Sequence, residues 1–122
     1  MLLAVSLMAG PGPLGEGPSP NTVSITLEWD DTNPPGLVDH FTIYSGPSSG
    51  NYTSAMSAGK ILDSTGTNYF VVVPGLARGV AYYFAATCTD ITGLESDFSN
   101  EVSYTAPTKP RPPVNFRNTQ TQ

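Results

Sequence analysis

Strict alternation of apolar and polar side chains between residues 23 and 29 constrains this fold more than any other feature of the sequence. From Val23 to Trp29 every odd-numbered residue is apolar and every even-numbered residue is polar. Successive side chains of a β-strand point to opposite faces of the sheet, whereas helical side chains return to one face every three or four residues. The period of two therefore predicts a strand with one buried face.

Short segments of the same kind continue as far as residue 104. Further strands are predicted over residues 38–44, 52–56, 60–62, 69–73, 82–88 and 102–104. Turn-forming residues separate them, and residues 74–79 (Pro-Gly-Leu-Ala-Arg-Gly) are predicted to form one of these turns. Seven short strands at this spacing, with no amphipathic helix of ten residues or more, indicate an all-β, antiparallel sandwich.

The inward faces of these strands define a predicted core. Trp29 is expected to pack inside rather than to serve as a ligand platform, because aromatic residues at a period of two on a strand usually face the core. Cys88 shares the register of Tyr82 and Phe84, so we expect a buried, inert thiol rather than a reactive one. The predicted core comprises Val23, Ile25, Leu27, Trp29, Phe41, Ile43, Leu76, Tyr82, Phe84, Cys88 and Val102.

The chain of 122 residues is long enough for one domain and divides into three zones. Residues 1–20 form an apolar, then Pro/Gly-rich N-terminal arm, residues 21–106 the domain, and residues 107–122 a Pro-rich basic tail. Residues 21–106 carry nine acidic residues and only two basic ones, Lys60 and Arg78, whereas the tail carries Lys109, Arg111 and Arg117 and no acid. This acidic balance argues against nucleic acid as the partner, since phosphate binding needs a basic face.

Several segments together resemble the fibronectin type III family. Val23–Trp29 resembles the second strand of that domain with its core tryptophan, and Phe41–Tyr44 resembles the third strand. Pro74–Tyr82 is similar to the loop in which Leu, Gly and Tyr follow at fixed offsets. The resemblance covers about residues 21–106. It implies a seven-stranded immunoglobulin-like sandwich in which the Tyr82 hydroxyl hydrogen-bonds to nearby backbone.

The chain departs from this family at its first strand. Gly17–Asn21, which stands in the place of that strand, is a poor strand sequence, so the first strand is expected to be missing or displaced. A sheet without it has an open edge. At the other end, Pro112–Arg117 resembles the linker and first strand of a following domain.

No group of residues fits a known catalytic or metal-binding pattern. His40 is the single histidine and Cys88 the single cysteine, which excludes the usual Cys/His zinc site. Glu28, Asp30, Asp31 and Asn33, and also Asp90, Glu95 and Asp97, are candidate calcium ligands, but neither group has the spacing of a recognised calcium loop. We therefore expect no catalytic residue, no metal and no cofactor, and a protein that is not an enzyme.

The two terminal arms are the candidate interaction elements. The open edge is expected to be completed either by the apolar N-terminal segment or by Val114–Phe116 of a neighbouring copy, which would link copies head to tail. The apolar N-terminal run is much too short to span a membrane, and no basic residue precedes it as in a secretion signal. The candidate assembly residues are Leu3, Val5, Leu7, Lys109, Arg111, Val114 and Phe116.

Two functional classes stay open at this stage. The first is a non-enzymatic accessory or decoration component of a bacteriophage virion or another large assembly, forming homo-oligomers or contacting other protein subunits. The second is a secreted or cell-surface module for adhesion or carbohydrate contact, with a truncated signal peptide. Its candidate contact residues are the tyrosines Tyr44, Tyr52, Tyr69 and Tyr83. The expected location is accordingly the virion, or the extracellular space or cell surface.

Overall fold

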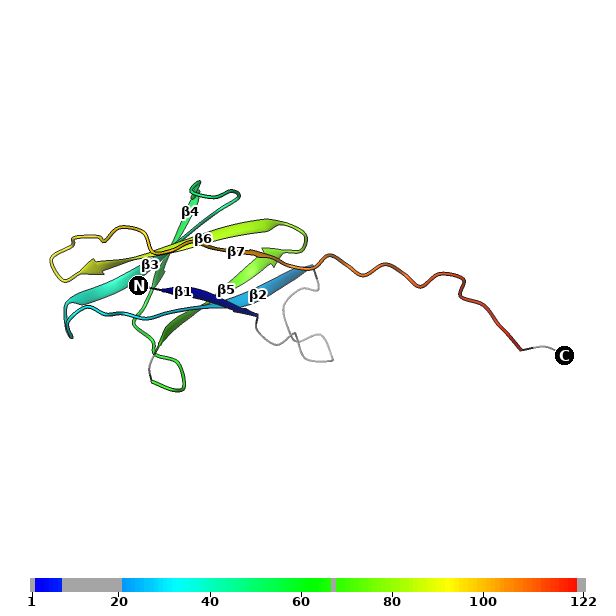
Figure 1. Ribbon diagram of the computed structural model, residues 1–122, viewed down its shortest axis with the longest axis horizontal. Coiled ribbons are helices and arrows are strands. Elements are labelled where there is room, and N and C mark those ends of the chain that lie inside the picture. Colours follow the sequence, from blue (N-terminus) through cyan, green and yellow to red (C-terminus); the bar gives the residue numbers. More distant parts are fainter. Residues whose placement is uncertain (1, 8–20, 67, 121–122) are drawn as a thin grey trace.

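Seven antiparallel strands in two sheets make up the computed structural model, which describes residues 2–7, 21–66 and 68–120 (Figure 1). There is no helix among these residues. The predicted all-β, seven-stranded antiparallel sandwich is therefore confirmed. The strands are β1 (Leu3–Leu7), β2 (Thr22–Trp29), β3 (Val38–Gly46), β4 (Ser54–Ala58), β5 (Tyr69–Ala77), β6 (Ala81–Asp90) and β7 (Val102–Thr105).

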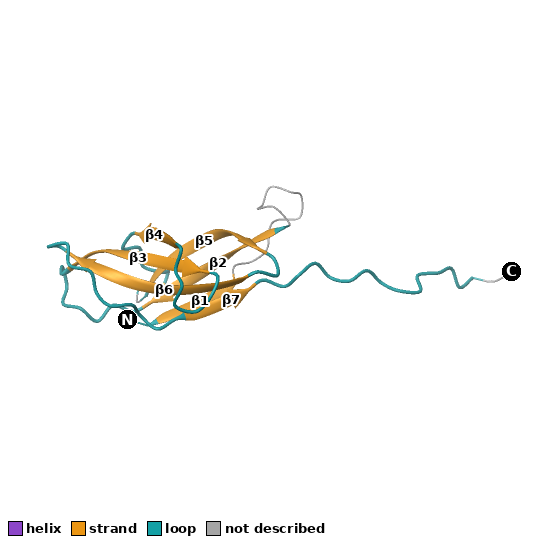
Figure 2. Cartoon of the chain, turned by 90° about the horizontal axis from the view of Figure 1, so that it is seen from above, coloured by secondary structure: helices purple, strands orange, loops and turns teal. Residues whose placement is uncertain are grey.

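The two sheets have different sizes and share one core. The smaller sheet has the order β1-β2-β5 and the larger one the order β4-β3-β6-β7. Figure 2 shows the C-terminal segment after β7 running away from the strands on its own. Since β6 and β7 are antiparallel, the β6–β7 connection lies at one end of the sandwich and the C-terminal segment leaves from the other (Figure 1).

The N-terminal segment of the chain itself supplies the displaced first strand. β1 pairs antiparallel with β2 in a register that runs from Leu3 opposite Trp29 to Leu7 opposite Ile25. Leu3 is only 2% exposed, and Asn100 fastens it by accepting a hydrogen bond from its backbone N–H at 2.9 Å and donating one to its carbonyl at 3.2 Å. Two segments were predicted to complete this edge, and in the structure the chain's own N-terminal segment does so. The Leu7 side chain and the Pro/Gly-rich stretch 8–20 lie outside the described residues.

Three details of the predicted strands were wrong. The strand predicted over residues 52–56 is β4, which runs from Ser54 to Ala58. Residues 60–62 form no strand: next to the Asp63–Gly66 turn they pair with β5 through a single bridge between Leu62 and Tyr69. Residues 74–77 are not part of a turn, because β5 continues to Ala77. The Pro-Gly pair at 74–75 instead interrupts the register with β2 as a bulge, with Gly75 at φ +75°.

The core lies between the sheets and consists largely of the predicted residues. Trp29 on β2 packs edge-on against Phe41 on β3 with ring centroids 5.1 Å apart, and Tyr69 on β5 packs on both. Of the predicted core residues, seven are buried: Ile25, Leu27, Trp29, Phe41, Ile43, Leu76 and Phe84. Four others, Val23, Tyr82, Cys88 and Val102, are only partly buried and pack against this cluster. Four residues outside the predicted core are also buried there: Leu3, Val38, Ala58 and Ala86.

Tyr82 and Tyr104 are cross-strand partners on β6 and β7, but among the described residues only the Tyr82 hydroxyl has a hydrogen-bond partner. The Tyr82 hydroxyl accepts a hydrogen bond from the backbone N–H of Ala77 at 2.9 Å, as the family resemblance implied. The Tyr104 hydroxyl is buried and has no hydrogen-bond partner among the described residues. A buried polar group without a partner costs about 1–3 kcal/mol of desolvation.

These two tyrosines give a paired stability prediction. Replacing Tyr82→Phe deletes a hydrogen bond and leaves the Ala77 N–H unpaired, so the free energy of unfolding should fall by about 1–2 kcal/mol. Replacing Tyr104→Phe removes an unpaired hydroxyl and should leave the stability unchanged or raise it. Urea unfolding followed by tryptophan fluorescence measures both. A loss in Tyr104→Phe as large as that in Tyr82→Phe would show that the Tyr104 hydroxyl has a partner.

Two neighbouring leucines test whether β1 belongs to the core. Leu3 is buried, whereas Leu2 is 60% exposed. Leu3→Ala should lower the free energy of unfolding by about 2–4 kcal/mol, because it leaves a cavity between the sheets. Leu2→Ala should change it by less than about 0.5 kcal/mol. Equal effects of the two substitutions would mean that β1 is not held against the core in solution.

Candidate functional site

The connection between β6 and β7 is folded against β6, and this contact builds the candidate site. Ser96 donates its N–H to the Cys88 carbonyl and accepts the Cys88 N–H with its hydroxyl, at 2.8 and 3.0 Å. Ser99 does the same for Ala86, at 2.8 and 2.9 Å. These bonds continue the β6 edge beyond the point where β7 pairs with it. The connection is thus held in one place, together with the Glu95 and Phe98 side chains that it carries.

Phe98 completes a cluster of three aromatic rings on the outer side of the four-stranded sheet. Its ring centroid lies 5.1 Å from that of Tyr44 on β3 and 5.1 Å from that of Tyr52, with both pairs edge-to-face. The two tyrosine rings are 6.4 Å apart. Phe98 remains 54% exposed, so the cluster presents an aromatic surface to solvent.

A glutamate accompanies each tyrosine of this cluster. Oε2 of Glu95 accepts hydrogen bonds from the Tyr44 hydroxyl at 2.5 Å and from the Thr87 hydroxyl at 2.7 Å. Oε2 of Glu101 accepts hydrogen bonds from the Tyr52 hydroxyl at 2.5 Å and from the Gly50 N–H at 2.9 Å. Within the described part of the chain, neither glutamate forms an ion pair with a lysine or arginine.

These hydrogen bonds hold the glutamates ionised and the tyrosines neutral. The tyrosine hydroxyls are the main cause that lowers the pKa of Glu95 and of Glu101. Burial, followed by the bond to Glu101, raises the pKa of Tyr52 to about 12. The bond to Glu95, followed by burial, raises the pKa of Tyr44. Near neutral pH the cluster therefore carries two negative charges beside three aromatic rings.

An open groove of about 310 Å³ runs along this cluster. Because Glu95 and Asp97 both line it and Glu101 stands nearby on Tyr52, the groove is acidic as well as aromatic. We call it the acidic aromatic groove; its lining residues are Tyr44, Thr87, Glu95, Ser96, Asp97 and Phe98, and Tyr52 and Glu101 flank it.

The four tyrosines proposed from the sequence as one contact face do not lie together. Tyr44 and Tyr52 belong to the acidic aromatic groove, but Tyr69 packs against the Trp29 and Phe41 rings of the core. Tyr83 is partly buried on β6, opposite Gly46. Phe98 was not predicted as a site residue, because nothing in an irregular polar loop indicates which strand it will cover.

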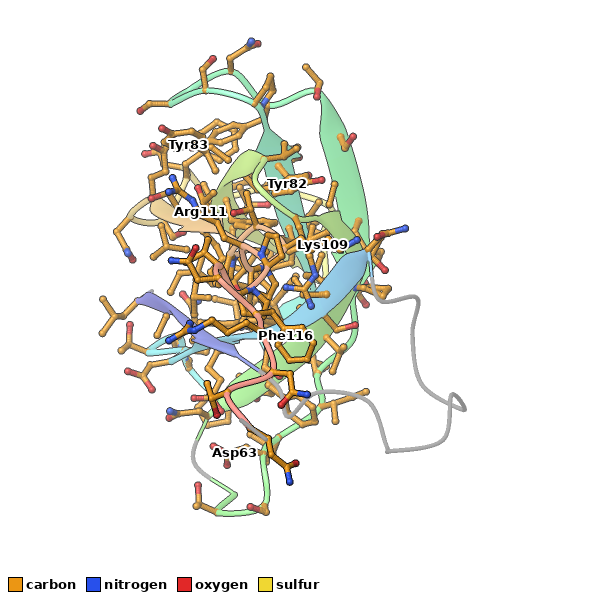
Figure 3. The ribbon with its side chains drawn as sticks, turned by 90° about the vertical axis from the view of Figure 1, so that its right-hand side faces the viewer. Asp63, Tyr82, Tyr83, Lys109, Arg111 and Phe116 are labelled. Atoms are coloured by element: carbon orange, nitrogen blue, oxygen red, sulfur yellow. The ribbon has the colours of Figure 1, made fainter. Side chains whose placement is uncertain are left out.

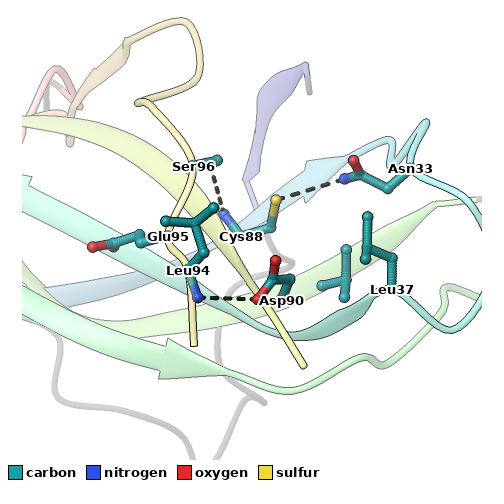
Figure 4. Close-up of a pocket in the computed structure, with 8 residues that line it drawn as sticks. Asn33, Leu37, Cys88, Asp90, Leu94, Glu95 and Ser96 are labelled. Atoms are coloured by element: carbon teal, nitrogen blue, oxygen red, sulfur yellow. Dashed lines mark hydrogen bonds between the residues drawn. The ribbon is translucent and has the colours of Figure 1, made fainter. Parts of the chain in front are cut away.

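A smaller hollow of about 150 Å³ lies beside the acidic aromatic groove and includes Cys88 (Figure 4). Asn33 donates a hydrogen bond to the Cys88 sulfur at 3.6 Å, and Leu37 and Leu94 form apolar walls. The Cys88 thiol is therefore only partly buried. Cys88 lies near the end of β6, where loops rather than the opposite sheet lie beside it (Figure 4).

The remaining candidate ligands have local structural roles. Oδ1 of Asp31 accepts hydrogen bonds from the backbone and side chain of Asn33, and Oδ1 of Asp90 accepts them from Thr92 and the Leu94 N–H. His40 contacts Asp39 at 2.9 Å. Over residues 2–7, 21–66 and 68–120, no three His, Cys, Asp or Glu side chains gather as a metal site would require. The same residues include no helix able to cross a membrane.

The C-terminal arm, residues 107–120, extends from the sandwich with its side chains exposed. Figure 3 looks along this arm and shows Lys109, Arg111 and Phe116 projecting from it. Phe116 is 95% exposed and Val114 is 81% exposed. Among the described residues, the sandwich holds the arm at its start, where Gly79 donates its N–H to the Ala106 carbonyl and Arg78 donates to the Pro107 carbonyl.

Comparison with known proteins supports the fold alone. No protein-family model and no curated protein sequence matches the chain. Its structure is similar to part of Astrotactin-2, described as a conserved, vertebrate-specific and perforin-like membrane protein involved in neuronal development. The TM-score is 0.53 at 19% sequence identity, over 89% of this chain and 22% of that protein. The chain is thus a β-sandwich domain that spans about a fifth of the length of that structure.

The Tyr52–Glu101 pair gives a pH prediction. Because the pKa of Tyr52 is raised from 10.0 to about 12, its stabilising contribution is complete below pH 10 and is lost as the pH rises toward 12. Absorbance at 295 nm, with Tyr52→Phe as the reference, follows its ionisation. In Glu101→Gln the Tyr52 pKa should fall but stay above 10.0, since burial is the larger cause. An unchanged Tyr52 pKa in Glu101→Gln would show that the pair does not form.

Proposed function

We propose that this chain is a non-enzymatic, fibronectin-type-III-like module that assembles with protein partners through its C-terminal arm. The fibronectin type III part of this proposal is supported by the sandwich of three plus four strands, the core position of Trp29 and the hydrogen bond between Tyr82 and Ala77. The observation that carries the functional proposal is the exposure of Phe116 and Val114 on an extended arm. Exposed aromatic side chains of this kind are typical anchors in protein interfaces.

The charge distribution supports binding between the arm and an acidic partner. The arm carries Lys109, Arg111 and Arg117 and no acidic residue, whereas residues 21–106 carry nine acids against two basic residues. Opposite charges on separate parts of a chain favour contact between molecules and speed their association. A partner with the acidic character of this domain would satisfy both the arm's charge and its apolar side chains.

The setting that we propose is a large assembly, with an accessory component of a virus particle as the leading case. Each copy of such a small module adds one compact domain to the assembly, and its arm attaches it through non-covalent contacts. Adhesion or carbohydrate contact at a cell surface or outside the cell is the other setting, and its candidate contact residues that lie together are Tyr44 and Tyr52.

Substitution of the arm's apolar anchors tests this proposal. Val114→Ser with Phe116→Ser should abolish assembly, because it removes the apolar area that the contact would bury. Sedimentation equilibrium over a range of concentrations gives the mass relative to the 12.9 kDa monomer. Ile61→Ser, also at an exposed apolar residue (60%), is the matched control and should leave the mass as in the unmodified chain. An unchanged mass in the arm variant would overturn arm-mediated assembly.

A further inference from the structure

We propose that the acidic aromatic groove is the receptor for the C-terminal arm of a second copy of this chain. This inference rests on the proposed role of the arm and adds the identity of its partner. The contact would join the Pro-rich basic segment 107–117 of one copy to the groove flanked by Glu95 and Glu101 on the next.

The arm has the sequence of a segment that docks in aromatic grooves. Pro107, Pro110 and Pro113 are spaced three residues apart, and a further proline follows Arg111. Such segments favour the extended polyproline conformation, so little conformational entropy is lost on binding, and aromatic-lined grooves commonly recognise them. Residues 107–113 have neither helix nor strand structure here, as this mode requires.

The groove offers what such a segment needs. The rings of Tyr44, Tyr52 and Phe98 lie at angles to one another with centroids 5.1–6.4 Å apart, which leaves ring surface for prolines to pack on. Both hydrogen bonds to Glu95 end on Oε2, so its Oε1 has no hydrogen-bond partner among the described residues. A guanidinium between the carboxylates and a ring face gains charge-assisted hydrogen bonds and a cation–π contact.

Charges elsewhere on the described surface do not compete for this site. Lys60 donates to the Val38 carbonyl, and Arg78 donates to the Pro107 carbonyl at the base of the arm. Arg117 donates to the Asn115 carbonyl within the arm, and the cations that remain among the described residues are Lys109 and Arg111, also on the arm. The acidic groove and the basic arm are therefore complementary within one sequence.

The geometry favours contact between copies. The arm leaves the end of the sandwich opposite to the β6–β7 connection that carries Glu95 and Phe98, and it runs away from the strands (Figures 1 and 2). Residues 107–117 in a polyproline conformation extend roughly 34 Å. The ten residues of β6 extend roughly 33 Å. An arm of about the length of the sandwich can cross onto the outer face of the next copy, and because donor and receptor surfaces differ, the contact is head-to-tail.

Mixing of two complementary variants tests this inference. The groove variant is Glu95→Gln with Glu101→Gln, which keeps the shape and the hydrogen-bond acceptors for the two tyrosines. The arm variant is Lys109→Glu with Arg111→Glu. Each alone should raise the dissociation constant of self-association by about tenfold or more. Mixed together, the arm of the groove variant can still bind the groove of the arm variant, so a 1:1 complex of twice the monomer mass should form and not grow further.

The matched control is Glu28→Gln with Asp63→Asn, which removes the same charge from residues outside the groove and should change the dissociation constant by less than about twofold. If the arm variant dissociates but the groove variant assembles normally, the groove is not the receptor, while arm-mediated assembly stands. If the mixture stays monomeric, the head-to-tail contact is overturned. If neither variant weakens assembly, the groove is not the receptor, and arm-mediated assembly then stands or falls with the Val114→Ser, Phe116→Ser variant. Circular dichroism of each variant shows that it is folded.

Discussion

The contact between Trp29 and Phe41 is the interaction on which the rest of this structure depends. The two rings belong to different sheets, and their edge-to-face contact, with Tyr69 against both, joins the sheets through the centre of the core. Aromatic side chains bury more area than any other residues, so this trio supplies a large share of the cohesion of a 122-residue chain without a disulfide. The register of β2 and β3 follows from these two inward positions.

The β6–β7 connection builds the acidic aromatic groove on this scaffold. Two serines take the place of strand partners along the edge of β6 and hold a polar loop there by hydrogen bonds. One of its residues, Phe98, then lies against Tyr44 and Tyr52, and Glu95 reaches the Tyr44 hydroxyl. The aromatic rings and the carboxylates of the groove thus come from segments that are separate in the sequence, and packing alone brings them together.

Terminal segments have opposite roles in this chain. The N-terminal segment is folded into the sandwich as β1, where it completes a sheet and shields Leu3. The C-terminal arm is held at its base and exposes apolar and basic side chains together. Prolines explain the difference, since a chain rich in them lacks the N–H donors that a strand needs and stays extended at little entropic cost.

The sequence by itself determined the strand pattern and the inward positions of β2, β3 and β6, because a period of two leaves only one way to bury Leu27, Trp29 and Phe84. It also indicated the separation of the acidic domain from the basic arm. Only the tertiary structure decided that Leu3–Leu7 is the first strand, β1, and that Pro74-Gly75 is a bulge, since both depend on which strand lies alongside. The groove could not be predicted from the sequence for the same reason. Side chains as far apart in the sequence as Tyr44 and Glu95 meet only because the β6–β7 loop packs against the sheet.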